Sequence, residues 1–238
     1  MREDAMSAPG TVPARPRGRM SDKRRAILDG ALTVFARDGY SRASIDAIAA
    51  QAAVSTRTIY NHFGDKAQLF HALITESATR VAEAQIAIID RYLHKVTDPE
   101  ADLIEFAQVW ATPVPDHADH FALVRHINAD AGHIPEAAID AWLRAGPLRV
   151  RRALAGRLQQ LAGQGLLRVE DPDWAAIHFV RLTTGGRRVL PATALTQQEI
   201  TEMATAGVRA FLHGYTARPG AAAGEPPTGA GRETPGSR

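Results

Sequence analysis

The chain has 238 residues, with 28 Lys and Arg against 26 Asp and Glu and a formal net charge of only +2 at pH 7. It contains no cysteine, which excludes a disulfide framework, a cysteine-ligated zinc or iron–sulfur site and a cysteine nucleophile. Hydrophobic residues make up 45% of the chain, enough for a sizeable core. No apolar run approaches the roughly 20 residues of a membrane-spanning helix, and the N-terminus lacks the apolar stretch of a signal peptide. These features predict a cytoplasmic protein with no membrane partner.

Both ends of the chain differ in composition from the middle. Residues 1–19 are rich in arginine, and the segment PARPRGR within them is predicted not to be helical because Pro and Gly interrupt it. This segment is either a disordered tail or a basic arm that lies along DNA phosphates or in a minor groove. Residues 217–238 contain Gly, Ala and Pro but no large apolar side chain, which predicts disorder.

Three helices around one small core are predicted between residues 22 and 66. The first, over residues 22–38, carries an apolar stripe and ends before Gly39. Ser44 and Ser55 are suitable N-caps for two short helices that a tight turn joins, since a hydroxyl can accept from a free backbone N–H at a helix start. The side chains predicted to form the core are Ile27, Phe35, Ile45, Ile48, Val54, Ile59, Phe63, Leu69 and Phe70.

The polar residues of the second short helix have no place in that core. A plain three-helix lobe of some other all-α protein needs no such cluster of groove-sized polar groups. The pattern therefore favours a helix-turn-helix, which places its second helix in the major groove of DNA. The residues left for outward faces are Thr56, Arg57, Thr58, Tyr60, Asn61 and His62.

The same segment resembles the DNA-binding signature of TetR/AcrR-type transcriptional regulators. The matching positions are Ile48-Ala49, Val54-Ser55, the run from Thr58 to Phe63, Lys66 and Leu69, with Phe35 and Gly39-Tyr40 matching the first helix and its end. The resemblance is gapless over about fifty residues. Ala53 departs from the pattern, because helix-turn-helix proteins often have Gly in this turn. A left-handed backbone there would cost an alanine roughly 1 kcal/mol.

DNA recognition needs phosphate contacts for affinity and base contacts for specificity. Ser44 can donate to a phosphate at a helix N-terminus, where the helix dipole adds attraction, and the resemblance implies the same role for Tyr60 and Lys66. Arg57 can reach a guanine edge with two hydrogen bonds, whereas His62 can contact DNA or cap its own helix. The predicted DNA-binding residues are Ser44, Ser55, Thr56, Arg57, Thr58, Tyr60, Asn61, His62 and Lys66.

The rest of the chain also reads as helical. A long helix from about Leu69 to His94 is predicted to run out of the lobe without a linker, so that it can transmit a tilt. Two further helices are predicted around Leu103–Trp110 and around a face formed by Phe121, Val124 and Asn128. A third covers Pro135–Gln164, with a break at Gly146-Pro147. The last two run from Asp171-Pro172 to about Gly185 and onward from the capping box of Thr196 and Glu199.

This second region resembles, more loosely, a TetR-type C-terminal domain. The similar positions are Arg125, Pro135-Glu136, Gly146-Pro147, Gly165, Asp171-Pro172 and Ala175-Ala176. The resemblance implies a homodimer that pairs the last two helices, about residues 173–185 and 196–215, although their apolar stripes also suit a monomer core. It also implies a small apolar or amphipathic effector. Candidate ligand-binding residues, each of which suits the core equally, are Phe106, Trp110, Phe121, Val124, Arg125, Trp142 and His178.

The sequence gives little support for a catalytic site or a metal site. The histidines of interest are His117, His120, His126 and His133. The first two stand three residues apart with acidic neighbours, a spacing that can hold zinc, but the nearby prolines indicate a polar loop or a helix start instead. We therefore predict no metal and no cofactor. The absence of a Gly-rich phosphate loop, a nucleophile elbow or a convincing acid/base pair indicates that the chain is not an enzyme.

The sequence as a whole predicts an all-α fold of about nine helices, in which a long helix joins a three-helix lobe to a helical bundle. The predicted parts are a basic arm (1–19), a DNA-binding domain (20–67), a ligand-binding and dimerisation domain (68–216) and a disordered tail (217–238). The predicted function is that of a dimeric repressor that binds a double-stranded DNA operator and is released from it by a small molecule. The alternative is a DNA-binding protein without small-molecule control, either nucleoid-organising or partner-regulated.

Overall fold

The computed structural model describes residues 17–129, 131–185 and 195–215, and within these ranges it contains helices and no strand. The all-α fold class is therefore confirmed. The α-helices are α1 (Arg17–Arg42), α2 (Ile45–Gln51), α3 (Thr56–Phe63), α4 (Lys66–Leu93), α5 (Pro99–Ala111), α6 (Ala118–Ala129), α7 (Glu136–Ala145), α8 (Pro147–Gly163), α9 (Pro172–Thr184) and α10 (Gln197–Tyr215). None of the described helices is both long enough and apolar enough to cross a bilayer.

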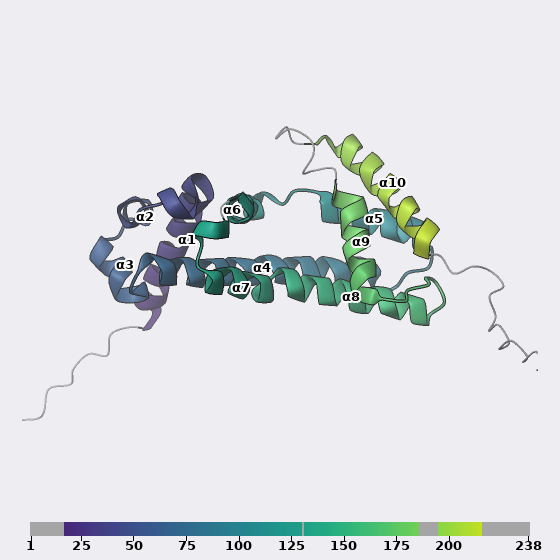
Figure 1. Cartoon of the computed structure of the whole chain (residues 1–238), viewed down its shortest axis with the longest axis horizontal. Helices are drawn as coiled ribbons and strands as arrows, with labels where there is room; N and C mark the ends of the chain where they lie inside the picture. Colours follow the sequence, from purple (N-terminus) through teal and green to yellow (C-terminus); the bar gives the residue numbers. More distant parts are fainter. Residues whose placement is uncertain (1–16, 130, 186–194, 216–238) are drawn as a thin grey trace, which may run out of the picture.

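The long helix α4 connects the two ends of the molecule (Figure 1). Helices α1, α2 and α3 form a lobe around its N-terminal end, and α5, α9 and α10 gather around its C-terminal end. Helices α7 and α8 follow one another along its side, and both pack against it. The break between them falls at Gly146-Pro147, as the sequence predicted, because proline cannot continue a helix from the preceding turn.

Side-chain caps fix where several helices begin. Asp65 accepts from the Gln68 backbone N–H at 2.7 Å at the start of α4, and Asp171 accepts from the Trp174 N–H at 3.0 Å at the start of α9. In the predicted capping box, Thr196 N–H donates to Glu199 at 2.7 Å, and Glu199 N–H donates to the Thr196 hydroxyl at 3.3 Å. These local hydrogen bonds satisfy backbone donors that a helix cannot satisfy itself.

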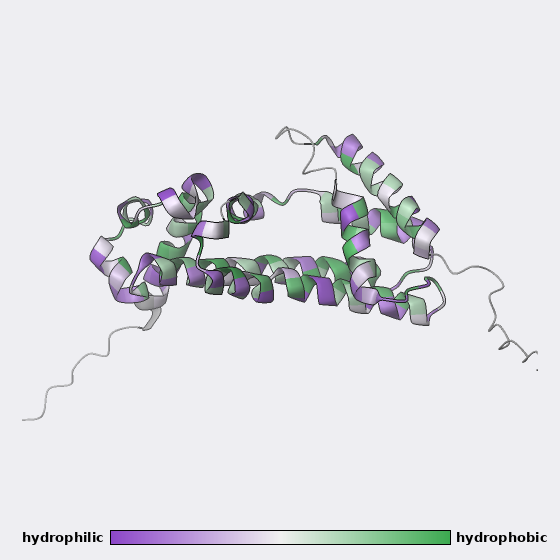
Figure 2. Cartoon of the chain, in the orientation of Figure 1, coloured by the Kyte–Doolittle hydropathy of each residue, from purple (hydrophilic) through white to green (hydrophobic). Residues whose placement is uncertain are grey.

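The hydrophobic interior consists of two clusters that meet along α4. The first holds the lobe together with Ile27, Phe35, Ile48, Ile59 and Phe70, and it extends to residues of α6 and α7. The second joins the C-terminal half of α4 to α5, α8, α9 and α10. Figure 2 shows apolar residues along α4, α7 and α8 where these helices lie together. Since α6 packs extensively against α1, a displacement of α6 would also displace α1.

Two local predictions are wrong. Helix α1 begins at Arg17, inside the segment predicted to be non-helical, because a single Gly18 costs a helix only about 1 kcal/mol. In α6 the buried side chains are His120, Leu123 and Ile127, whereas Phe121 is 39% exposed. The predicted face of Phe121, Val124 and Asn128 lines a cavity instead. The contacts of α6 with α1 and α4, which the sequence does not reveal, decide which face is buried.

Candidate nucleic-acid interface and cavity

Helices α2 and α3 are joined by the tight turn that the sequence predicted. Ser44 Oγ accepts from the Ala47 backbone N–H at 3.1 Å, and Ser55 Oγ accepts from the Thr58 N–H at 3.2 Å, so both serines are N-caps. Between the helices, the Val54 N–H donates to the Ala49 carbonyl at 3.0 Å. Ala53 has φ of 52°, in the left-handed region. Ala53 therefore has the left-handed backbone that explains why helix-turn-helix proteins often have Gly at this position.

Replacing Ala53 by glycine is expected to stabilise the protein by about 1 kcal/mol, because glycine adopts this backbone without the steric cost of a Cβ. Urea unfolding of the two proteins measures the difference. The matched control is Ala50→Gly in the exposed part of α2, which should destabilise by about 0.5–1 kcal/mol. Equal losses at both positions would show that the Ala53 backbone is not strained.

Helix α3 buries one side and exposes the other. Ile59 and Phe63 point into the lobe core. Arg57, Tyr60 and Asn61 are exposed, and the Tyr60 side of the helix is open to solvent, with that residue 52% accessible. The predicted DNA-binding residues that are exposed or half-buried are Ser44, Ser55, Thr56, Arg57, Thr58, Tyr60, Asn61, His62 and Lys66, which is the whole set.

Besides the capping serines, Thr58 and Lys66 already have partners within the protein. Thr58 Oγ1 lies 2.9 Å from Ser55 Oγ, so its hydroxyl takes part in the cap. Lys66 Nζ lies 4.8 Å from the centroid of the Tyr40 ring and donates to the Ser41 carbonyl at 3.4 Å. Burial lowers the pKa of Lys66 from its ordinary value. The sequence did not reveal these contacts, because the partners of Lys66 lie 25 or more residues away along the chain.

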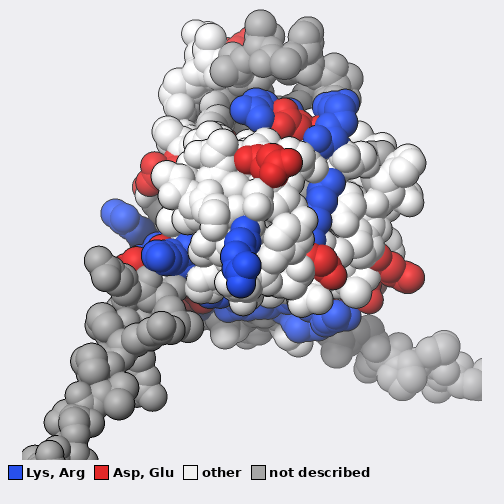
Figure 3. Space-filling model, turned by 90° about the vertical axis from the view of Figure 1, so that its left-hand side faces the viewer, with Lys and Arg blue, Asp and Glu red and all other residues white. Residues whose placement is uncertain are grey.

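The end of the molecule that carries the lobe has a mixed charge pattern. Figure 3 shows Lys and Arg side chains spaced over this face, with acidic side chains and a large uncharged area between them. Asp46 stands in the first turn of α2, and Asp65 lies at the start of α4. A face of this kind provides separate anchor points for phosphates rather than one basic block, which agrees with the small net charge.

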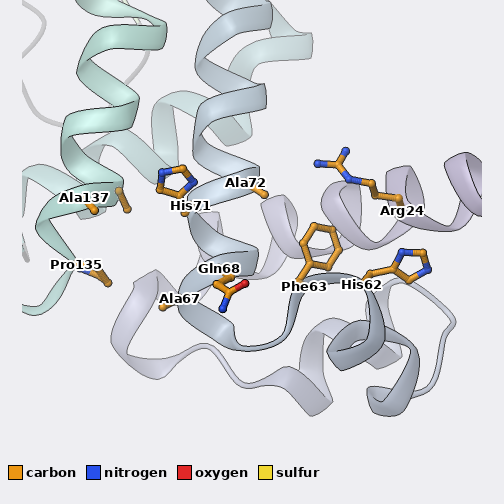
Figure 4. Close-up of a pocket in the computed structure, with 10 residues that line it drawn as sticks. Arg24, His62, Phe63, Ala67, Gln68, His71, Ala72, Pro135 and Ala137 are labelled. Atoms are coloured by element: carbon orange, nitrogen blue, oxygen red, sulfur yellow. The ribbon is translucent and has the colours of Figure 1, made fainter.

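A hollow lies where the lobe meets the second domain (Figure 4). Its lining comes from α1, the end of α3, the start of α4 and the start of α7. The Arg24 guanidinium lies 5.5 Å from the centroid of Phe63 and forms an ion pair with Glu76 at 3.0 Å. His62 stands beside Phe63 at the rim. Arg24 thus links α1 to α4 across this junction.

A second, less open cavity of about 570 Å³ lies in the C-terminal domain, between α4, α6, α7, α8 and α9, with Trp110 of α5 at its wall. Its walls are mostly apolar, and its volume is in the range of small-molecule sites. The apolar and aromatic lining includes Val81, Trp110, Phe121, Val124, Trp142, Val150, Leu154, Ile177 and Val180. Helices α6 and α7, which share a core with the lobe, also form part of this cavity wall.

The seven candidate ligand residues do not all meet there. Trp110, Phe121, Val124 and Trp142 line the cavity, and Arg125 lines a neighbouring one beside it. Phe106 is fully buried and stacks on Phe179, so it belongs to the core. His178 lies outside both cavities and is hydrogen-bonded to Tyr215 Oη at 2.7 Å. Arg151 and Arg181 also line the cavity, and the sequence did not predict this, because a cation beside an apolar stripe usually faces solvent.

A buried polar pair stands at the cavity wall. His120 Nδ1 lies 2.8 Å from Ser77 Oγ, and both residues are buried. Burial, with a smaller contribution from His117, lowers the pKa of His120 to about 4, so its ring is neutral at neutral pH. Within the described residues no group of three His, Asp or Glu side chains has the arrangement of a metal site. His126 instead lies against Gly39, and His120 is buried on α6 with its Nδ1 beside the Ser77 hydroxyl.

Comparison with known proteins identifies the family. Residues 27–73 match the N-terminal domain of the bacterial regulatory proteins of the tetR family, and residues 102–217 match the C-terminal domain of AefR-like transcriptional repressors. The chain belongs to the TetR family. Its members are transcriptional regulators rather than enzymes, so the prediction that the chain is not an enzyme holds.

Individual relatives of this TetR-family protein agree with that assignment. The transcriptional repressor AcnR of Corynebacterium efficiens is 36% identical over 81 residues, which are 33% of this chain and 43% of AcnR. The match thus spans less than half the length of that relative. A TetR-family regulator from Mesorhizobium loti has 26% identity and a TM-score of 0.72, covering 83% of this chain and 98% of its own. The flavonoid-responsive regulator FrrA has 29% identity and a TM-score of 0.59, covering 83% and 99%.

Proposed function

We propose that this protein is a dimeric transcriptional repressor that binds an operator through α3 and leaves it when a small molecule fills the cavity between α4, α6, α7, α8 and α9. The observation that carries the proposal is the amphipathic α3. Its apolar side closes the lobe core, and Arg57, Tyr60 and Asn61 face outward. We assign base contacts to Thr56, Arg57, Thr58 and Asn61, and phosphate contacts to Ser44, Tyr60 and Lys66. The proposed location is the cytoplasm, where the chromosome of a bacterium is accessible.

The packing of α6 supports control by a ligand. Helix α6 makes the most extensive interhelical contact of the described chain with α1, and Thr33 Oγ1 of α1 donates to Asp119 of α6 at 3.3 Å. The opposite side of α6 lines the cavity. A molecule that moves α6 therefore displaces the lobe through α1. The cavity disfavours the alternative of a DNA-binding protein without small-molecule control, and FrrA is by its name a regulator that responds to flavonoids.

The outward side of α9 supports a homodimer. Two large apolar side chains of this helix are exposed, Trp174 at 56% and Leu182 at 42%. Two lobes that bind successive half-sites also give the affinity that a single helix-turn-helix lacks. We therefore propose that residues 173–185 and 196–215 pair with their equivalents in a second copy. We also propose the division of the chain into residues 20–67 for DNA and 68–216 for ligand and dimer.

Selection from a pool of random DNA duplexes tests the proposed function. The expected result is enrichment of an inverted repeat whose half-sites are about one helical turn, or a multiple of it, apart. A footprint on the selected duplex should then cover both half-sites. If no sequence is enriched at low salt, where electrostatic binding is strongest, the protein is not a sequence-specific DNA-binding regulator.

A further inference from the structure

The charged side chains that line the cavity are of one sign. Its lining includes the guanidinium groups of Arg151 and Arg181, and among the residues that the structure describes it includes no Asp or Glu. Arg181 is exposed at the cavity edge, and no described acidic side chain forms an ion pair with it. A cationic ligand would meet repulsion from these guanidinium groups, and no carboxylate of the described lining would neutralise it.

Arg151 keeps hydrogen-bonding capacity despite its ion pair. Its Nε lies 3.0 Å from Asp173 Oδ1, but the angle does not satisfy a hydrogen bond, and the buried Nε has no other acceptor in the described structure. The Asp173 side chain is 59% exposed and does not line the cavity, so solvent screens this ion pair. An acceptor inside the cavity would complete the set of partners for this guanidinium.

Trp142 gives a second, independent indication. Its indole Nε1 is buried, lacks any acceptor in the described structure, and belongs to a residue that lines the cavity. An indole N–H can only donate, and leaving a buried donor without a partner costs about 1–3 kcal/mol. Trp142, Gly146, Pro147 and Arg151 lie together where α7 ends and α8 begins. Helix α8 has neither a side-chain cap nor an acidic residue in its first turn, which leaves its N-terminal end positive.

The other walls of the cavity are apolar or neutral. Val81, Trp110 and Phe121 line it away from the α7–α8 junction. The His120 ring is uncharged at neutral pH, and its Nδ1 is occupied by Ser77. The described lining of the cavity therefore combines two cationic side chains and a residue with a buried, unpartnered indole donor with a mostly apolar surface.

We infer that the effector of this chain is an amphipathic organic anion. Its acidic group lies near Arg151 and Arg181, where a turn of the Trp142 ring lets Nε1 donate to it, and its aromatic or aliphatic body lies against Val81, Trp110 and Phe121. The inference rests on the proposed function, in which this cavity is the effector site. It names the chemical class of the effector, and it excludes ammonium ligands.

Two fluorescent probes with one aromatic skeleton test this inference. They are 1-anilinonaphthalene-8-sulfonate, an anion, and N-phenyl-1-naphthylamine, which lacks the sulfonate and is neutral. The anion is expected to bind the full-length protein about tenfold more tightly, since hydrogen bonds to an ionised acceptor are about twice as strong as neutral ones. The cation benzyltrimethylammonium should not displace either probe. Equal affinities for the two probes, or displacement by the cation, would overturn the inference.

Substitutions of cavity residues test whether the tighter binding of the anionic probe takes place in this cavity. Trp142→Phe, Arg151→Gln and Arg181→Gln should each reduce the preference for the anion and leave the affinity for the neutral probe unchanged, which also shows that the cavity is intact. The control is Arg144→Gln on α7, since Arg144 is exposed, pairs with Asp140 and does not line the cavity. A preference that survives all three cavity substitutions would place the anion elsewhere and contradict the inference. Because these titrations contain no DNA, their failure leaves the proposed operator binding intact, and a mobility-shift assay tests that binding separately.

Discussion

Replacing Arg57 by alanine is expected to weaken operator binding by about 1–3 kcal/mol, or roughly 5- to 150-fold. Arg57 is exposed in the first turn of α3, with its helix held in place by the Ser55 cap and by the buried Ile59. A guanidinium in this position can donate two hydrogen bonds to the O6 and N7 atoms of a guanine. The loss should therefore be confined to the cognate sequence, and discrimination at one base pair of each half-site should decrease.

Mobility-shift titrations on the selected operator and on its single-base variants measure both effects. The control is Arg80→Ala, which removes the same charge from an exposed position of α4, far along the chain from α3, and should change affinity by less than about twofold. If affinity falls equally on every duplex, and the slope of log affinity against log salt concentration falls by about one, Arg57 contacts a phosphate instead of a base. An unchanged affinity would remove it from the interface.

Local chemistry made the helix-turn-helix predictable from the sequence. Ser44, Ser55 and Asp65 each cap a helix within three residues of themselves, so the information lies in a short window. The left-handed turn at Ala53 follows from the same spacing. The burial of Ile59 and Phe63 follows from helical periodicity, which leaves Arg57 and Asn61 outside.

The cavity was less predictable because it depends on contacts between distant segments. In α6, residues Phe121 and Val124 looked like a core face, yet the packing of α1 against α6 buries Leu123 instead. Phe106 and Trp110 are one helical turn apart, but only Trp110 reaches the cavity, since Phe179 covers Phe106. The local sequence cannot tell which of these residues is buried in the core and which lines the cavity, because all of them are apolar and lie at helical spacing.

Replacing Gly207 by alanine is expected to destabilise the protein by about 1–3 kcal/mol, as overpacking of a core does. Gly207 is buried on α10 where that helix crosses α9, and a Cβ there would overlap the Leu182 carbonyl and lie 3.0 Å from Thr183 Cα. Backbone atoms of a helix cannot rotate out of the way as a side chain can. The two helices must therefore separate, which also loosens the contact between Phe179 and Phe211, whose ring centroids are 5.2 Å apart.

The same helix offers a matched control. At Gly214 an added Cβ meets no atom within 4 Å, so Gly214→Ala should be neutral or stabilising by up to about 1 kcal/mol. Urea unfolding measures both variants, and sedimentation equilibrium measures the dimer.

Since Leu182 is also one of the exposed apolar residues of the proposed dimer surface, Gly207→Ala should weaken self-association, whereas Gly214→Ala should not reduce stability. A Gly207→Ala protein as stable as its parent would show that α9 and α10 do not approach this closely. A destabilised variant that still dimerises with unchanged affinity would instead place the dimer contact outside the α9–α10 pair.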